Sequence, residues 1–312
     1  MNLPTSPPDP SLDGTVLVPG APSTPAPISE RKQARRENWR LIRRRPSFII
    51  GNLITFVWVV CAVLGNRITP HHPLDFRTKP NLSPRSDFWF GTDKTGRDVL
   101  SRVMAGARDV LKIAPAAALL GVILGVLLGM VMGYVGKRVD MVLSRLVEAF
   151  LALPVILISL LAITTLGNSS WVVLGVVATL FTPVVARTVR SAVMAERDLD
   201  YVTSAKLRGE SKMFIMFREI LPNITGPIVV ELTVRIGYAV FTVATLSFIG
   251  AGDPSVMSWG RMLNNAQQYM RQAWWTAAFP GLAISLMAMS VALMADGVND
   301  LLDPRLRKRV SA

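Results

Sequence analysis

The chain has 312 residues, of which 51% are hydrophobic, and its formal net charge is +13. The apolar residues fall into long runs and the mean hydropathy is positive, which excludes an ordinary soluble domain and indicates an integral membrane protein. The Lys and Arg residues flank these runs, so we attribute the charge to membrane topology and expect no binding to nucleic acid.

The apolar runs predict an all-α membrane protein with six spans, each near the roughly 20 residues that a helix needs to cross the hydrocarbon core. We place the spans at residues 47–66, 113–136, 141–166, 171–189, 227–250 and 274–296. Only the segment from Gly167 to Ser170 separates the third span from the fourth, so we expect these two to form a tight antiparallel hairpin. An even number of spans places both ends of the chain on the same side of the membrane.

The distribution of Lys and Arg predicts that both termini are cytoplasmic. With the amino terminus inside, 22 of these residues lie on the cytoplasmic side and 11 on the other side, which is the bias expected of a membrane protein. We expect residues 1–35 to form a disordered, Pro-rich cytoplasmic tail and residues 304–312 a basic cytoplasmic tail. Residues 36–112 then hold the first span and an extracytoplasmic loop. Residues 113–303 form the membrane core, with a cytoplasmic loop at about 190–226.

The sequence shows no set of catalytic residues. It has no P-loop, no HExxH and no GxSxG motif, and the segment GTDKTG at residues 91–96 lacks the closing Lys and Ser or Thr of a phosphate-binding loop. We interpret His71 and His72 as loop residues rather than metal ligands, and Cys61 has no partner for an internal disulfide. The pattern favours transport or a structural role over an enzyme, with no metal or cofactor bound by this chain.

Glycine and proline predict how the spans pack. Four glycines in the second span recur at every fourth position, which lines them along one helix face and allows close approach of another helix. These helix-packing residues are Gly121, Gly125, Gly129 and Gly133. Three prolines inside other spans predict kinks. They are Pro154, Pro183 and Pro280.

Three ionisable residues, Glu148, Glu231 and Arg235, lie at or within membrane depth. Charged side chains are costly there unless they are paired or face a wet cavity. Glu231 and Arg235 are four residues apart, so they can pair along one helix face. A structural pair and a role in lining a substrate pathway are equally compatible with this pattern, and both stay open.

A polar, basic segment from Tyr201 to Asn223 separates the fourth and fifth spans. Residues 200–207 suit a short helix, Gly209 suits its carboxyl end and Ser211 can cap a second helix. The second helix has one apolar side and is expected to close at Pro222. The apolar residues are Met213, Met216, Phe217, Ile220 and Leu221. Such a pair would fit a groove on a soluble partner, and from this pattern alone it could equally lie on the membrane surface.

These residues resemble the signature loop of permeases in ATP-binding cassette importers. Its pattern is Glu-Ala-Ala, three residues, Gly, nine or ten residues, and then Ile-Leu-Pro. The Glu-Ala-Ala places are taken here by Thr203, Ser204 and Ala205, Gly209 follows, and Ile220, Leu221 and Pro222 end the pattern. The first two positions depart from the pattern, which affects any ionic contact that an acidic residue would make.

Further motifs resemble the second permease subunit of dipeptide and oligopeptide importers over residues 38–309. They are WRLIRRRPSFIIG before the first span, FGTDKTGRDVLSRVMAGAR at 90–108, RLVEAFLALP at 145–154, LSFIGAG at 246–252, SWGRML at 258–263, FPGLAIS at 279–285 and DGVNDLLDPRLR at 296–307. Val243 departs from the pattern, because relatives often carry an acidic residue there. The resemblance implies the six-helix fold of type I importer permeases.

The resemblance also implies partners and roles. The chain would form half of a peptide pathway in the bacterial cell membrane, together with a sister permease, two ATPase subunits that bind ATP and Mg²⁺, an extracytoplasmic binding protein and surrounding lipid. Coupling to the ATPases would fall to Tyr201, Thr203, Ser204, Ala205, Gly209, Phe217, Ile220, Leu221 and Pro222, and contact with the binding protein to Gly91–Arg108 and Gly252–Met262. Import of nickel, glutathione or haem by the same fold, and a membrane scaffold that transports nothing, are the alternatives.

Overall fold

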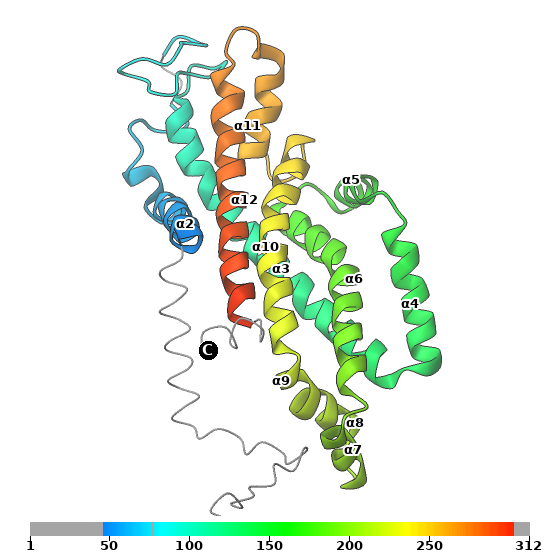
Figure 1. Ribbon diagram of the computed structural model, residues 1–312. Coiled ribbons are helices and arrows are strands. Elements are labelled where there is room, and N and C mark those ends of the chain that lie inside the picture. The colour runs from blue at the N-terminus through cyan, green and yellow to red at the C-terminus, as the bar shows by residue number, and fades with distance from the viewer. Residues whose placement is uncertain (1–45, 76–77, 303–312) are drawn as a thin grey trace, which may run out of the picture. The chain divides into compact units, whose positions relative to one another are not determined.

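The computed structural model describes residues 46–75 and 78–302, and every regular element in these ranges is a helix (Figure 1). The all-α prediction is therefore confirmed for this part of the chain. The tails predicted at 1–35 and 304–312 lie outside the described residues.

Five helices are long and apolar enough to cross a membrane alone, and two shorter ones form a bent pair. The five are α2 (Pro46–Leu64), α3 (Val99–Val135), α6 (Ser170–Glu196), α10 (Thr225–Phe248) and α12 (Trp275–Leu302), and the pair is α4 (Lys137–Leu151) with α5 (Val155–Leu166).

The glycine face of α3 packs directly against α6. A Cβ atom added to Gly121 would lie 2.8 Å from the carbonyl oxygen of Ala178, and one added to Gly133 would lie 2.7 Å from the Cβ of Val193. The two glycines between them approach α6 as closely. No side chain fits in this space, so the glycines have the packing role that their spacing predicts.

The same contacts give the direction of the two helices. Residue numbers rise together along the contact, from Gly121 against Ala178 to Gly133 against Val193, so α3 and α6 run parallel. A chain that crosses the membrane twice in the same direction must return in between. The bent pair α4–α5 makes this return, and it therefore accounts for the third of the six predicted spans.

That third span is broken, whereas the sequence suggested one helix over residues 141–166. α4 and α5 meet at an angle of 89°, around a short break before Val155. Pro154 has an extended backbone, with φ −63° and ψ 114°. Proline has no N–H to donate and disfavours a helical conformation at the residue before it, here Leu153. The tight turn at Gly167–Ser170 therefore joins α6 to the short helix α5, and not to a continuous third span as expected.

Three helices, α3, α6 and α12, extend well beyond their predicted spans. α3 begins at Val99 rather than at 113, because the Asp98 carboxylate caps it by accepting a hydrogen bond from the Ser101 N–H at 3.0 Å. At 1.5 Å per residue α3 is about 55 Å long, well over the roughly 30 Å of the hydrocarbon core. α6 continues to Glu196. The prolines at 183 and 280 lie inside α6 and α12 without ending either helix.

The short elements gather at the two ends of the helix bundle (Figure 1). One end holds α7 (Asp200–Leu207), α8 (Lys212–Phe214), η2 (Ile215–Ile220) and α9 (Leu221–Asn223). The other holds η1 (Gly65–Arg67), the loop 78–98, α11 (Trp259–Ala266) and η3 (Gln267–Tyr269). The end with α7, α8, η2 and α9 has an apolar core that contains Met130. The core at the other end contains Trp259. We call residues 200–223 the helix pair and residues 78–98 the capping loop.

Candidate functional site

The helix pair begins as the sequence predicts. α7 spans Asp200–Leu207, and Gly209 follows with a φ of 79°, which side-chain-bearing residues rarely adopt. The Ser211 hydroxyl then accepts a hydrogen bond from the Phe214 N–H at 3.2 Å and caps the second helix. The first helix, its glycine end and the serine cap are therefore confirmed.

The end of the second helix was predicted wrongly. α8, η2 and α9 follow one another without a gap, and Pro222 lies inside this run; the helical path breaks only at Ile224. η2 is a π-helix, in which the Leu221 N–H donates to the carbonyl of Met216, five residues earlier. In an α-helix the ring of Pro222 would clash with the carbonyl four residues before it. The wider π turn accommodates the proline, so it does not close the helix.

The apolar side of the second helix faces the protein itself. Met216 and Ile220 are buried and join a core that contains Val126 of α3 and Val189 of α6. This corrects the idea that the apolar side would lie in a groove on a partner. The buried side attaches the helix pair to the bundle, and while it is buried neither a partner nor lipid can contact it.

Three large apolar side chains of the helix pair are exposed, and one of them, Met213, belongs to the predicted apolar side. Leu207 is 84% exposed, Met213 62% and Phe214 39%. We call these three residues the tip. Large apolar side chains that are exposed to this extent, with charged residues beside them, are candidates for contact with a partner protein. The tip residues flank the turn at Gly209, and Arg208 in that turn pairs with Glu219 of the second helix at 3.1 Å.

The residues that the resemblance assigned to coupling have three different environments. Thr203, Ser204, Gly209 and Pro222 are exposed, Tyr201, Phe217 and Leu221 are half-buried, and Ala205 and Ile220 are buried. The exposed members are available to a partner, and the buried ones position the helix pair. Leu207 and Phe214 were missed in the sequence, because the apolar pattern there was interpreted as a single side that includes Met216 and Ile220.

Polar contacts connect the start of the helix pair to the ends of α6 and α3. The Tyr201 hydroxyl donates to the Glu196 carboxylate at 2.7 Å, and burial together with this bond raises the pKa of Tyr201 to about 12. Arg197 donates to the carbonyl of Gly133 at 2.9 Å, and Lys206 donates to the carbonyl of Arg197 at 3.2 Å. These bonds join the helix pair to the end of α6, and the end of α6 to α3.

The ion pair predicted from spacing forms in α10. The Arg235 Nε donates to the Glu231 carboxylate at 2.9 Å, and both side chains are largely buried. The Thr188 hydroxyl of α6 donates to the other Glu231 oxygen at 2.8 Å. The pair thus joins α6 to α10. Glu148 does not take part, because it lies exposed on α4.

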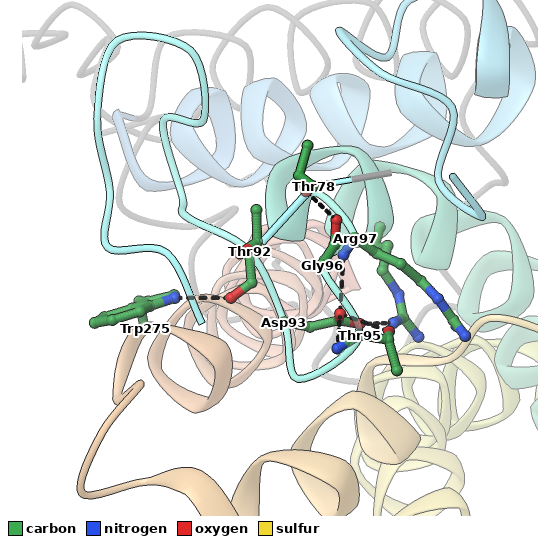
Figure 2. A network of polar contacts seen from close by, with 8 residues as sticks. Thr78, Thr92, Asp93, Thr95, Gly96, Arg97 and Trp275 are labelled. Carbon is green, nitrogen blue, oxygen red and sulfur yellow. Dashed lines mark hydrogen bonds and ion pairs between the residues drawn. The ribbon is translucent and has the colours of Figure 1, made fainter. Parts of the chain in front are cut away.

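At the other end of the bundle, Asp93 organises the capping loop (Figure 2). One of its carboxylate oxygens accepts hydrogen bonds from the Thr95 N–H at 2.8 Å, the Thr95 hydroxyl at 2.7 Å and the Arg97 N–H at 3.0 Å. The other oxygen pairs with Arg102 of α3. A side-chain carboxylate thus takes the backbone donors that an anion would use in a phosphate-binding loop. The GTDKTG segment is folded around its own aspartate.

Contacts with residues distant in the sequence fix the rest of the capping loop. The Trp275 indole N–H donates to the carbonyl of Thr92 at 3.2 Å, and Figure 2 shows the indole directed at that carbonyl. Gly96 has a φ of 79°, and a Cβ there would lie 2.1 Å from the carbonyl oxygen of Thr78. These glycine and indole contacts were missed in the sequence. The glycines of the GTDKTG segment indicated a turn in the sequence, but nothing there indicated that Trp275 contacts it.

The second segment expected on the outer face, Gly252–Met262, is fixed to the same end of the bundle. Trp259 is fully buried, and its indole donates to the carbonyl of Val103 at 2.7 Å. Arg261 donates to the carbonyls of Gly252 and Asp253, at 2.8 and 2.7 Å. The structure therefore brings this segment and the start of α3 together.

Comparisons with known proteins agree on the class of this chain. Residues 125–308, which include the helix pair, match the family described as binding-protein-dependent transport system inner membrane component. The chain is 32% identical over 295 residues to the dipeptide transport system permease protein DppC of Alkalihalophilus pseudofirmus, an alignment that covers 93% of this chain and 97% of the relative.

Two further relatives extend the comparison. A putative peptide transport system permease protein of Brucella suis is 38% identical over 270 residues, which is 86% of this chain and 90% of the relative. The dipeptide transport system permease protein DppC of Escherichia coli K12 is 34% identical over 296 residues, which is 92% and 97% of the two chains.

Proposed function

The chain belongs to the family of inner membrane components of binding-protein-dependent transport systems, and we propose that it imports short peptides as one half of an ATP-driven permease. It is a multi-pass, non-catalytic membrane subunit of such a system. Peptides are favoured as cargo because the relatives above are named as dipeptide or peptide permeases. Nickel, glutathione and haem are the alternative cargoes.

The helix pair is the observation that carries the coupling part of the proposal. It lies outside the apolar spans, its buried side attaches it to α3 and α6, and its tip exposes three large apolar residues. An ATPase subunit that contacts the tip would move the helix pair as a unit. The contacts of Tyr201 and Arg197 would then pass this movement to the spans.

The remaining partners follow from the same system. A sister permease would supply the other half of the pathway, and two ATPase subunits would bind ATP and Mg²⁺ on the side of the helix pair. The binding protein would meet the capping-loop end. The two chain termini would then be cytoplasmic, in keeping with the excess of Lys and Arg on that side of the spans.

Purification of the native complex tests the assembly. The chain is isolated from native membranes in mild detergent, and the proteins recovered with it are identified by mass spectrometry. We expect a related permease and ATPase subunits. Repeated recovery of the chain without any ATPase would contradict the proposal and support the alternative of a membrane scaffold.

Uptake by cells tests the cargo. A strain that lacks this subunit is complemented with the wild-type chain, and uptake of a radiolabelled dipeptide is measured with unlabelled dipeptide, nickel, glutathione or haem as competitors. We expect uptake to depend on the chain and to be competed only by the dipeptide. Competition by nickel, glutathione or haem alone would assign another cargo.

A charge at the tip tests coupling. Leu207→Asp places a carboxylate in the exposed apolar surface, so we expect loss of binding-protein-stimulated ATPase activity, with the chain still recovered in the membrane. Arg218→Gln is the matched control, since Arg218 is exposed on the second helix but lies outside the tip. Normal stimulation in Leu207→Asp would exclude the tip as the ATPase contact.

A further inference from the structure

A cavity of about 140 Å³ lies between the capping loop on one side and α11, η3 and the start of α12 on the other. Its capping-loop side is formed by Asp93, Lys94 and Arg97, and Arg102 of α3 lies beside them. The facing side provides neutral polar groups, the amide of Asn265 and the hydroxyls of Tyr269 and Thr276. Neither the ion pair in α10 nor the helix pair takes part in this cavity.

The charges around the cavity do not balance. Three cationic side chains face one carboxylate, that of Asp93, and both oxygens of this carboxylate already accept hydrogen bonds from the capping loop and Arg102. The side chain of Arg102 is only 10% exposed, and its Nε has no partner among the described residues. The Nε of Arg97 is likewise buried and without a partner in the described part of the chain. These two Nε atoms have almost no accessible surface, so what the cavity offers a ligand is its excess of positive charge from Lys94, Arg97 and Arg102.

Lys94 is the third cation of the lining. The contact that the structure gives its ammonium is with the ring of Tyr269, at 5.8 Å from the centroid. A cation over an aromatic ring keeps its hydrogen-bond donors available. Guanidinium and ammonium groups around one small space are the pattern that binds a carboxylate.

The size of the cavity restricts the ligand. A volume of this kind holds on the order of ten water molecules, which is room for one acidic side chain but not for a folded segment. The capping loop, which forms one side of the cavity, lies at the end of the bundle opposite the helix pair (Figure 1). A single carboxylate brought by a protein at that end fits both the charge and the volume.

We propose that this cavity receives an Asp or Glu side chain of the extracytoplasmic binding protein, with Arg97, Arg102 and Lys94 as the recognising groups. The inference rests on the proposed function, because it requires a binding protein. A buried carboxylate that contacts these donors would fix the docking register and would increase the affinity of the delivery step. The loop motif GTDKTGRD then has a role beyond its own fold, since it positions two of the three cations.

The test measures binding of the purified binding protein to the whole importer in nanodiscs of phosphatidylcholine, a lipid without net charge. Arg97→Gln removes a buried charge-assisted contact, so we expect the dissociation constant to rise about tenfold. Lys94→Gln is the second variant and is expected to raise the dissociation constant by a smaller factor, because Lys94 is more flexible.

Arg85→Gln is the matched control, since Arg85 is half-exposed in the capping loop, pairs with Asp87 and does not line the cavity. Arg102 is left unchanged because it also holds Asp93.

Three results would overturn the inference. One is an unchanged dissociation constant in both Arg97→Gln and Lys94→Gln. Another is an equal loss in the Arg85→Gln control, which would indicate general electrostatic attraction. The third is weaker binding of a free dipeptide with unchanged affinity for the binding protein, which would assign the cavity to a substrate carboxylate. If the wild-type importer itself does not bind the binding protein, the proposed function fails, and that outcome is distinct from all three.

Discussion

The capping loop and the helix pair stand at opposite ends of one bundle and are held in different ways. Directional polar bonds fix the capping loop, with Asp93 at its centre and an indole from Trp275 against its backbone. The helix pair is held mainly by apolar burial, through Met216 and Ile220. Hydrogen bonds allow one geometry, whereas apolar contacts tolerate small sliding movements. The capping loop is suited to present a fixed shape, and the helix pair is suited to move.

This difference gives alternating access a physical basis in the proposed importer. Movement would enter at the tip, where the helix pair can shift on its apolar side without breaking a directional bond in its own core. The parallel contact of α3 with α6 would then carry it toward the other end, because their glycine-lined interface leaves no flexible side chain to absorb the shift. The capping loop would stay in shape while the spans below it reorient.

Asp93→Ala should have the largest effect, because it removes the centre of the polar network. The backbone donors of the loop lose their acceptor and Arg102 is left as a buried, unpaired charge. We expect a loss of about 3 kcal/mol in the free energy of unfolding, measured by thermal unfolding of the purified complex. Asp87→Ala is the control, since Asp87 is exposed in the same loop. Equal melting temperatures for Asp93→Ala and wild type would show that the loop does not depend on this carboxylate.

Ile220→Ala should come next and should affect only the helix pair. The side chain is fully buried in the apolar core at that end, and its truncation leaves a cavity that costs about 2 to 4 kcal/mol. We expect faster hydrogen exchange in residues 200–223 and unchanged exchange in residues 78–98. Equal changes in both segments would contradict the idea that the two ends are held independently.

Gly209→Val should have a smaller effect, of about 1 to 2 kcal/mol, because the positive φ at this position is strained for a residue with a side chain. Nothing lies within 4 Å of the added Cβ, so the cost is conformational and not a clash. Gly209→Asn is the control, since Asn tolerates this backbone region better. We expect the ratio of transported substrate to ATP hydrolysed to fall in Gly209→Val and to stay near wild type in Gly209→Asn. An unchanged ratio in both would show that the turn is not needed for coupling.

The two ends also differ in how much the sequence could predict. Helix signals are local, so the α7 helix, the turn at Gly209 and the cap at Ser211 could be located from a few neighbouring residues. Pro222 was misinterpreted because the rule for α-helices does not foresee a π turn. The capping loop depends on Trp275, which is 183 residues from Thr92 along the chain, and on the contact of Gly96 with Thr78 at the start of the loop. No local pattern indicates such contacts, so the folded state of this loop could not be predicted.

Tyr201→Phe should have the smallest effect. It tests a polar contact of the helix pair, which is otherwise held mainly by apolar burial. The substitution keeps the ring and removes the hydroxyl, which bonds to Glu196 and also contacts Asn223, so we expect a loss of about 1 kcal/mol in the free energy of unfolding. The pKa of this hydroxyl is raised from 10.0 to about 12 in the folded protein. The stabilisation is therefore fully present below pH 10.0 and declines as the pH rises toward about 12. Thermal unfolding at pH 7 and pH 9 should show the same difference between variant and wild type. A difference that shrinks between these two values would mean that the hydroxyl ionises in the folded protein and that the contact with α6 is weaker than its geometry indicates.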